Sequence, residues 1–365
     1  MRTTPLTMPQ QVMPILHQAQ SLVGPALRAA VRGLAPAMRQ IVAYQLGWHD
    51  QTGHPVAERN SGKAVRAALA LACCEAAGAG RERAVPAAVA VELVHNASLL
   101  HDDLLDGDQM RRGRPAVWSA FGISAALLAG DALFFLAVRV MVDPFATIGL
   151  AGPGGGLGGG MAAGPGVVCL ADTVRELIEG EYADMVLERR AQISVGESQA
   201  VAAGKTAVLI AASCALGAMA AGAAGQVVER MRGFGHHVGV AFQYVDDLLG
   251  IWGDPAATGK PARSDLATRK KSLPVAYALA SGTPAGADLA ALYAAAPGPL
   301  AGGHLERAAE LVERAGGRAW AIAQADQHIT AALDHLAAMR TLTGRRGEAV
   351  ADLATLANLI THRDR

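Results

Sequence analysis

Apolar residues recur at helical spacing from about Pro25 to the end of the chain. No run of residues alternates convincingly between apolar and polar with period two. A repeat near 3.6 residues is typical of helices, and alternation is typical of half-buried strands. The pattern therefore predicts an all-helical chain without a β-sheet, with helices spanning 63–77, 85–105, 124–142, 171–190, 204–221, 230–251 and 305–340.

One stretch breaks the helical pattern. Residues 143–166 include the run GLAGPGGGLGGGMAAGPG, which is rich in glycine and offers few side chains that could pack. Because glycine disfavours helix and gives the backbone freedom, we expect a flexible surface loop at about 143–166, between two helices. We see no other compositional break, so residues 1–365 are expected to form a single helical domain.

Composition adds three constraints. Apolar residues make up 52% of the chain but aromatic residues only 4%, so helices packed closely through small side chains are expected. Lysine plus arginine balances aspartate plus glutamate at 32 each, which leaves no basic surface typical of a nucleic-acid-binding protein. The four cysteines show neither metal-ligand spacing nor a disulfide framework, which favours a reducing cytoplasm.

One segment raises the question of a membrane. Residues 206–228 carry no charge over more than the ~18 residues that would suggest a transmembrane helix. The segment is built largely from alanine and glycine, however, and Lys205 stands at its head. We therefore expect a buried core helix there, and a soluble protein with no signal peptide and no transmembrane segment.

The first candidate site is a group of carboxylates, Asp102, Asp103 and Asp106, at the end of an almost wholly apolar stretch. On a helix, Asp102 and Asp106 lie one turn apart on the same face, with Asp103 beside them. Carboxylates crowded in this way repel one another unless a cation lies between them. Hard oxygen ligands suit Mg²⁺, which takes the rest of its shell from water and substrate phosphates.

Arg111 and Arg112 follow these carboxylates, where Gly113 and Pro115 should break the helix. Guanidinium groups match phosphate oxygens in a bidentate way. Carboxylate, metal ion and arginine together describe a diphosphate-binding site.

A second acidic pair, Asp246-Asp247, also follows an apolar helix and precedes Leu-Leu. The position one turn after Asp246 is Gly250, so the third carboxylate is missing there. The two acidic sites could face each other across one helical bundle. Further basic residues accompany them: Lys63, Arg66, Lys205, Lys260 and Lys270.

Together these residues resemble the trans-isoprenyl diphosphate synthases, the polyprenyl synthetase family that includes farnesyl and geranylgeranyl diphosphate synthases. The matching motifs are, in chain order, Gly62-Lys63-x-x-Arg66, His95, Asp102-Asp103-x-x-Asp106 with Arg111-Arg112-Gly113, Gly180-Glu181-x-x-Asp184, Lys205-Thr206, Phe242-Gln243-x-x-Asp246-Asp247 and Gly259-Lys260. The resemblance implies an all-α helical bundle around a deep central cavity, the isoprenoid synthase fold. It also implies a homodimer.

The resemblance further implies roles for individual residues. Asp102 and Asp106, with Asp103 in support, would hold two Mg²⁺ ions, and Asp246 would hold a third. The residues expected to bind the allylic diphosphate are Arg111, Lys205, Thr206, Gln243 and Lys260, with Lys270 nearby. Those expected to bind isopentenyl diphosphate are Lys63, Arg66, His95 and Arg112. The aspartates and Lys205 would act directly in catalysis by stabilising the departing diphosphate.

The length of the product should depend on the residues preceding Asp102. In the family, bulky aromatic residues at the positions of Ala97 and Ser98 stop growth at fifteen carbons. The small residues here, with Val94 one turn deeper, imply a longer product, first of all geranylgeranyl diphosphate. Phe134 and Phe135 on a later helix are candidates for the floor of the cavity.

Two other functions remain open from the sequence. A class I terpene cyclase also ionises a diphosphate at aspartate-rich Mg²⁺ sites, but usually lacks the isopentenyl diphosphate pocket that Lys63, Arg66, His95 and Arg112 would form. A non-catalytic regulatory subunit of a heteromeric synthase typically loses the first aspartate motif, which is intact here.

Overall fold

The computed structural model describes residues 12–56, 64–144, 148, 163–190, 192–255, 262–295, 298–339 and 342–361. Among these residues, the strands are limited to one antiparallel pair of two-residue strands, β1 (Met110–Arg111) and β2 (Arg114–Pro115). The helices are α1 (Val12–Arg32), α2 (Pro36–Gln45), α3 (Val65–Ala76), η1 (Arg81–Ala84), α4 (Val85–Leu105), α5 (Val117–Phe121), α6 (Ile123–Val142), α8 (Ala163–Arg189), α9 (Val195–Ala202), η2 (Ala203–Ala207), α10 (Val208–Ala220), α11 (Gly225–Trp252), α13 (Ser264–Ala267), α14 (Leu273–Ala280), α15 (Pro284–Ala294), α16 (Gly303–Arg314), α17 (Gly317–Ala337) and α18 (Gly344–Thr361). The prediction of an all-helical fold is confirmed.

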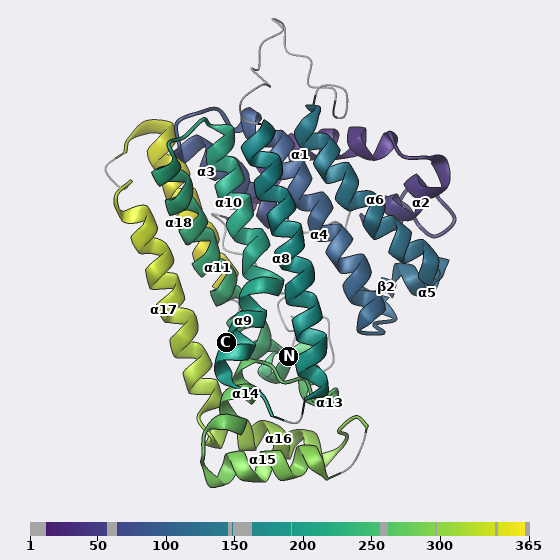
Figure 1. Ribbon diagram of the computed structural model, residues 1–365, viewed down its shortest axis with the longest axis vertical. Helices are drawn as coiled ribbons and strands as arrows, with labels where there is room; N and C mark the ends of the chain where they lie inside the picture. The colour runs from purple at the N-terminus through teal and green to yellow at the C-terminus, as the bar shows by residue number, and fades with distance from the viewer. Residues whose placement is uncertain are drawn as a thin grey trace, which may run out of the picture.

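The long helices form a bundle. Figure 1 shows α8, α10, α11 and α17 running roughly alongside one another, with α6 beside α8 and α4 beside α6. Helices α15 and α16 cross one end of the bundle and pack on a smaller hydrophobic core of their own that includes Leu289, Leu311 and Val312. The two acidic motifs therefore lie near the ends of α4 and α11, two helices of the same bundle.

Several predicted boundaries are wrong; α11, for example, begins at Gly225 and not at residue 230. Helix α8 begins at Ala163, so residues 163–166 are helical rather than loop, because proline is tolerated in the first turn of a helix and Pro165 lies there. Residues 145–147 and 149–162 of the predicted loop lie outside the described residues. The predicted helix 305–340 is two helices, because Gly316 adopts a left-handed φ of 87° and ends α16.

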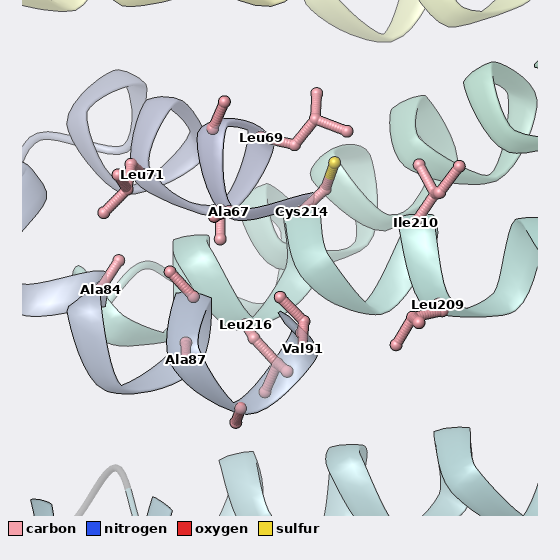
Figure 2. Packing of buried hydrophobic residues seen from close by; sticks show 14 of the residues in the cluster. Ala67, Leu69, Leu71, Ala84, Ala87, Val91, Leu209, Ile210, Cys214 and Leu216 are labelled. Carbon is pink, nitrogen blue, oxygen red and sulfur yellow. The ribbon is translucent and has the colours of Figure 1, made fainter. Parts of the chain in front are cut away.

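Small residues let the core helices approach closely, as the composition predicted. Figure 2 shows Val91 of α4 beside Leu216 of α10 in the main core, to which Leu69 of α3 also belongs. A Cβ atom at Gly217 would lie 2.1 Å from the carbonyl oxygen of Ala70, so α10 meets α3 backbone to backbone. All four cysteines are buried and free, as the sequence suggested.

Two stretches of the described residues are long and apolar enough to cross a membrane by length and composition. In Val195–Ala220, 61% of the apolar window is buried inside the fold, which confirms the prediction of a buried core helix there. In Ile123–Val142, which is α6, only 33% is buried. A core position therefore does not account for the outer face of α6.

Candidate active site

The first acidic site lies at the end of α4, whose other turns are mostly buried. Asp102 and Asp103 belong to the last turn of the helix, and Asp106 follows it. One carboxylate oxygen each from Asp102, Asp106 and Glu181 lie within 4.8 Å of one another. Three hard oxygen donors at this separation fit Mg²⁺, so the residues present agree with the metal that the sequence predicted.

The hairpin β1–β2 folds Arg111 back onto these carboxylates. Arg112 and Gly113 form its turn with φ angles of 53° and 74°, and a two-residue turn with both φ angles positive suits the twist of a hairpin. Arg111 Nε donates to Asp103 Oδ1 at 2.6 Å, and Arg111 Nη2 donates to Asp102 Oδ2 at 3.2 Å. Because Asp103 is buried and pairs with Arg111, it is placed to position the arginine.

Lys205 joins three carboxylates at the centre of the site. Its Nζ lies 2.9 Å from Asp102 Oδ1, 3.0 Å from Glu181 Oε1 and 3.0 Å from Asp184 Oδ2. Burial alone would lower the pKa of Lys205, but the surrounding carboxylates, Asp102 foremost, raise it above its usual value. Lys205 therefore stays positively charged next to the candidate metal ligands.

Two glycines bring Lys205 to this place. A Cβ at Gly180 would lie 2.6 Å from the carbonyl carbon of Gly204, so α8 and the π-helical segment η2 touch through their backbones. Short π-helical segments occur frequently at functional sites. Glu181 and Asp184 of the motif Gly180-Glu181-x-x-Asp184 were not predicted as site residues. Their spacing of three residues, which places both carboxylates on one face of a helix, was the signal that could have revealed them.

The carboxylates of the first site repel one another. Burial, and then the neighbouring Asp102 carboxylate, raise the pKa of Glu181 to about 7, with Lys205 opposing them. Burial and Asp102 also raise the pKa of Asp106. The pKa of Asp102 itself is lowered, because Lys205 and then Arg111 outweigh the effect of burial. A bound cation would relieve this repulsion.

In the second acidic pair the two aspartates differ in role. Asp246 is exposed, whereas Asp247 is buried. Asp247 accepts hydrogen bonds from the Leu273 backbone N–H at 2.8 Å and from Gln243 Nε2 at 2.7 Å, and burial raises its pKa to about 7. Asp247 thus anchors the start of α14, and Asp246 is the carboxylate of the pair that is open to a ligand.

Three of the residues predicted to contact the allylic diphosphate, Thr206, Gln243 and Lys270, lie near this pair. Thr206 Oγ1 donates to Gln243 Oε1 at 2.5 Å, which connects the segment that carries Lys205 to α11. Lys270 has a raised pKa despite burial, because Asp247, Asp265 and Asp184 surround it. Its neighbour Lys271 instead donates to main-chain oxygens at the end of α8, including Glu188 O at 2.9 Å. Lys260 lies outside the described residues.

The space that a third aspartate would fill at position 250 is occupied by another carboxylate. An ideal Cβ at Gly250 would lie 2.2 Å from Asp265 Oδ2. Asp265, at the start of α13, therefore approaches the backbone of α11 one turn after Asp246. Glycine at 250 is what leaves room for it.

A second group of cations lies beside α4. Half-buried Arg66 has a buried Nε atom without a hydrogen-bond partner in the described structure. Burial, Arg66 and Arg112 hold the pKa of His95 well below its usual value. Glu92 shares this environment, and its pKa is raised by burial although Arg66 opposes the rise. The structure thus brings Arg66, His95 and Arg112 together, whereas Lys63 lies outside the described residues.

The residues predicted to set product length lie on α4 inside the fold. Val94 and Ala97 are fully buried, and Ser98 is half-buried with its hydroxyl donating to the carbonyl of His95 at 2.9 Å. Phe134 is half-buried and meets the ring of His101 edge-on at 5.7 Å. Phe135 is 77% exposed on the outer face of α6, so within this chain it does not form the floor.

Comparisons with known proteins agree with this arrangement. The polyprenyl synthetase family profile matches residues 53–312. The chain is 44% identical to "(2E,6E)-farnesyl diphosphate synthase" from Mycobacterium tuberculosis over 98% of this chain and 94% of that protein. It is 42% identical to "Geranylgeranyl diphosphate synthase" from the same species over 87% of each. A polyprenyl synthetase structure from Streptomyces coelicolor A3(2) superposes with a TM-score of 0.85 and 40% identity, covering 96% of this chain and 99% of that one. The chain belongs to the polyprenyl synthetase family of trans-prenyltransferases.

Proposed function

We propose that this enzyme condenses isopentenyl diphosphate with an allylic diphosphate to give geranylgeranyl diphosphate. The observation that carries the proposal is the meeting of Asp102, Glu181 and Asp184 on Lys205, next to the Arg66, His95 and Arg112 group. The first set suits a diphosphate held through metal ions, and the second suits a diphosphate held by cations alone. Two diphosphate sites side by side are what the condensation requires.

The proposed metal ligands are Asp102 and Asp106, with Glu181 beside them. Asp246, which is exposed on α11, is the ligand proposed for a further ion by the family resemblance. Bound Mg²⁺, three ions by family resemblance, would neutralise the diphosphate that leaves the allylic substrate. Lys205, Arg111 and Lys270 add fixed positive charge where that negative charge grows. Asp103 holds Arg111 in place for this task.

The reaction that these residues support begins when the allylic C–O bond breaks and its electron pair leaves with the diphosphate. Arg66, His95 and Arg112 would hold isopentenyl diphosphate so that its double bond attacks the allylic carbon. The new C–C bond is followed by loss of a proton, which we assign to the released diphosphate. The apolar residues of α4 would keep water from the cation. No protein nucleophile takes part.

The small residues on α4 support a product longer than fifteen carbons. Because Ala97 and Ser98 are small, they would not block a growing chain below the first aspartates as aromatic side chains would. The relatives named above include both a farnesyl and a geranylgeranyl diphosphate synthase, so a farnesyl product is the alternative that product analysis must exclude.

Two functions of other classes fit less well. The Arg66, His95 and Arg112 group has no use in a terpene cyclase, which needs no second diphosphate. The intact Asp102 and Asp106 site argues against a non-catalytic regulatory subunit. We also propose that the protein is cytoplasmic and that residues 1–365 form a single domain.

The experiment that tests this function measures diphosphate release from geranyl or farnesyl diphosphate. We expect rapid release only with Mg²⁺ and isopentenyl diphosphate together, and none after chelation with EDTA. Equally fast release without isopentenyl diphosphate would indicate a cyclase. No release with any allylic primer from folded protein would indicate a non-catalytic subunit.

We also propose that the enzyme is a homodimer through the outer face of α6 and α8. These two neighbouring helices expose large apolar side chains at Ile123, Leu127, Leu128, Phe135, Val142, Val168, Ile178, Tyr182 and Val186. Large apolar side chains exposed on neighbouring helices are typical of protein interfaces. A second copy of the chain, bringing the same face, would cover it.

Placing charge on this face should produce monomers. In Leu128→Glu/Phe135→Glu, two carboxylates would lose their hydration in the interface, which is unfavourable without partners. We expect sedimentation at the monomer mass at micromolar concentration, whereas Met13→Glu on α1 should remain dimeric. If the double variant sediments like the unchanged protein, this face is not the interface.

The approach of Asp265 to Gly250 leads to a further prediction. We propose that Asp265 supplies the carboxylate that position 250 lacks. Gly250→Asp should collide with Asp265 and raise the Mg²⁺ concentration for half-maximal activity by about tenfold. Gly250→Asp/Asp265→Gly should recover, because it exchanges the positions of carboxylate and glycine.

The matched control is Gly250→Ala/Asp265→Gly, which relieves the collision without returning a carboxylate. This variant should still need the raised Mg²⁺ concentration for half-maximal activity. Equal recovery by both double variants would show that only space matters at this position, and not the charge.

A further inference from the structure

Lys271 connects two segments of the active site that lie far apart in the sequence. It precedes α14, and its half-buried side chain reaches the end of α8, 81 to 84 positions earlier in the chain. Lys271 Nζ donates to Leu187 O at 3.3 Å, to Glu188 O at 2.9 Å and to Arg190 O. The proposed reaction assigns no role to this lysine.

The three contacts use the full donor capacity of the ammonium group. A lysine ammonium carries three N–H donors, and Lys271 has three carbonyl acceptors. The last carbonyls of a helix have no partner within the helix, and a positive charge near them is favourable. Lys271 therefore caps the end of α8 from another segment, and its donors are already used for that purpose.

The neighbouring Lys270 turns to the acidic residues of the site. Burial alone would lower the pKa of Lys270, but Asp247, Asp265 and Asp184 raise it above its usual value. Asp184 belongs to α8 and lies one turn before Leu187 and Glu188. Two consecutive lysines thus meet the same end of α8, one through a carboxylate and the other through main-chain oxygens.

The backbone around Lys270 is also held from the other side. The Lys270 N–H donates to Asp265 O at 2.8 Å, and the Leu273 N–H donates to Asp247 Oδ2 at 2.8 Å. These bonds fix the segment 269–273 to α13 and α11. Among the contacts described, those of Lys271 are the ones that fix this segment to α8, which carries Glu181 and Asp184.

We propose that Lys271 is a positioning residue for the allylic diphosphate, because it ties the segment 269–273 to the end of α8 and thereby holds Lys270 near Asp184. The inference rests on the proposed function, in which Lys270 binds that diphosphate. Lys271 contributes through the placement of Lys270, since its own donors are occupied by carbonyl oxygens.

The first test measures the binding of geranyl diphosphate to the full chain by titration calorimetry with Mg²⁺. Lys271→Met should weaken this binding by about tenfold, because a displaced ligand loses much of its contribution. The KM for isopentenyl diphosphate should stay unchanged. Lys271→Arg should restore most of the affinity, since arginine can also donate to the last carbonyls of a helix.

A double-mutant cycle separates placement from charge. If Lys271 acts through Lys270, Lys270→Met/Lys271→Met should bind geranyl diphosphate no more weakly than Lys270→Met alone. Arg307→Met is the control for loss of a distant cation, because Arg307 forms surface ion pairs on α16, and its affinity should not change. Losses that add in the double variant would overturn the positioning role.

Hydrogen exchange tests the tie without any substrate. The backbone amides of Lys270 and Leu273 should exchange faster in Lys271→Met than in the unchanged protein. Unchanged exchange would mean that Lys271 does not hold this segment, and the inference would fail while the proposed function stands. If the unchanged protein binds no geranyl diphosphate, the proposed function fails, and this inference fails with it.

Discussion

Asp102→Ala is expected to lower turnover by about 10³-fold or more. Asp102 lies within metal-ligand distance of Asp106 and Glu181, and it also pairs with Lys205 and Arg111. Removing it takes away a proposed metal ligand and leaves both cations without their shared partner. Since the charges that stabilise the departing diphosphate are the main source of catalysis, the loss should appear in kcat. Steady-state kinetics at saturating Mg²⁺ measures it.

The control for charge alone is Asp288→Ala. Asp288 is an exposed carboxylate on α15 whose surface ion pair with Arg307 spans 3.5 Å, so its removal should leave turnover unchanged. Asp102→Asn, which keeps the size of the side chain, should be nearly as inactive as Asp102→Ala. Turnover near that of the unchanged enzyme in either Asp102 variant would exclude the metal assignment.

If the main product has twenty carbons, as proposed, Ala97→Phe/Ser98→Phe is expected to change it to fifteen. Both residues precede Asp102 on α4, and Ala97 is fully buried. Two aromatic rings would fill the space in which the chain grows, so elongation should stop one isoprene unit earlier. Mass spectrometry of the dephosphorylated products, with geranyl diphosphate as primer, reports the distribution.

The variant must be separated from a general packing defect, since enlarging buried side chains commonly costs 1–3 kcal/mol. Val89→Phe, at another fully buried position on α4 further from Asp102, is the matched control. It should destabilise the protein without shortening the product. A twenty-carbon product from the folded double variant would mean that α4 does not limit growth.

The helices that sequence predicted best are those with strong local patterns. The predicted helix 85–105 coincides with α4, because an apolar run ended by three aspartates marks both its burial and its end. The proximity of Arg111 to Asp102 and Asp103 could also be predicted from residues close in sequence. Local spacing sufficed there because each partner lies within a few turns along the chain.

Contacts between distant segments were not predictable in this way. Glu181 and Asp184 reach Lys205 only because Gly180 and Gly204 allow two helical segments to touch. The turn at Arg112 and Gly113 produces a hairpin too short for an alternating pattern to reveal. Asp265 fills the space at Gly250 because of the way α13 packs against α11. The spacing of residues along the chain does not predict that packing.

The most direct test of the central claim is product analysis. The purified protein with Mg²⁺ and isopentenyl diphosphate is incubated separately with dimethylallyl, geranyl and farnesyl diphosphates, and the products are read by mass spectrometry after phosphatase treatment. We expect a linear twenty-carbon alcohol from each primer. Cyclic hydrocarbons formed without isopentenyl diphosphate, or no product from any primer, would contradict the proposed synthase.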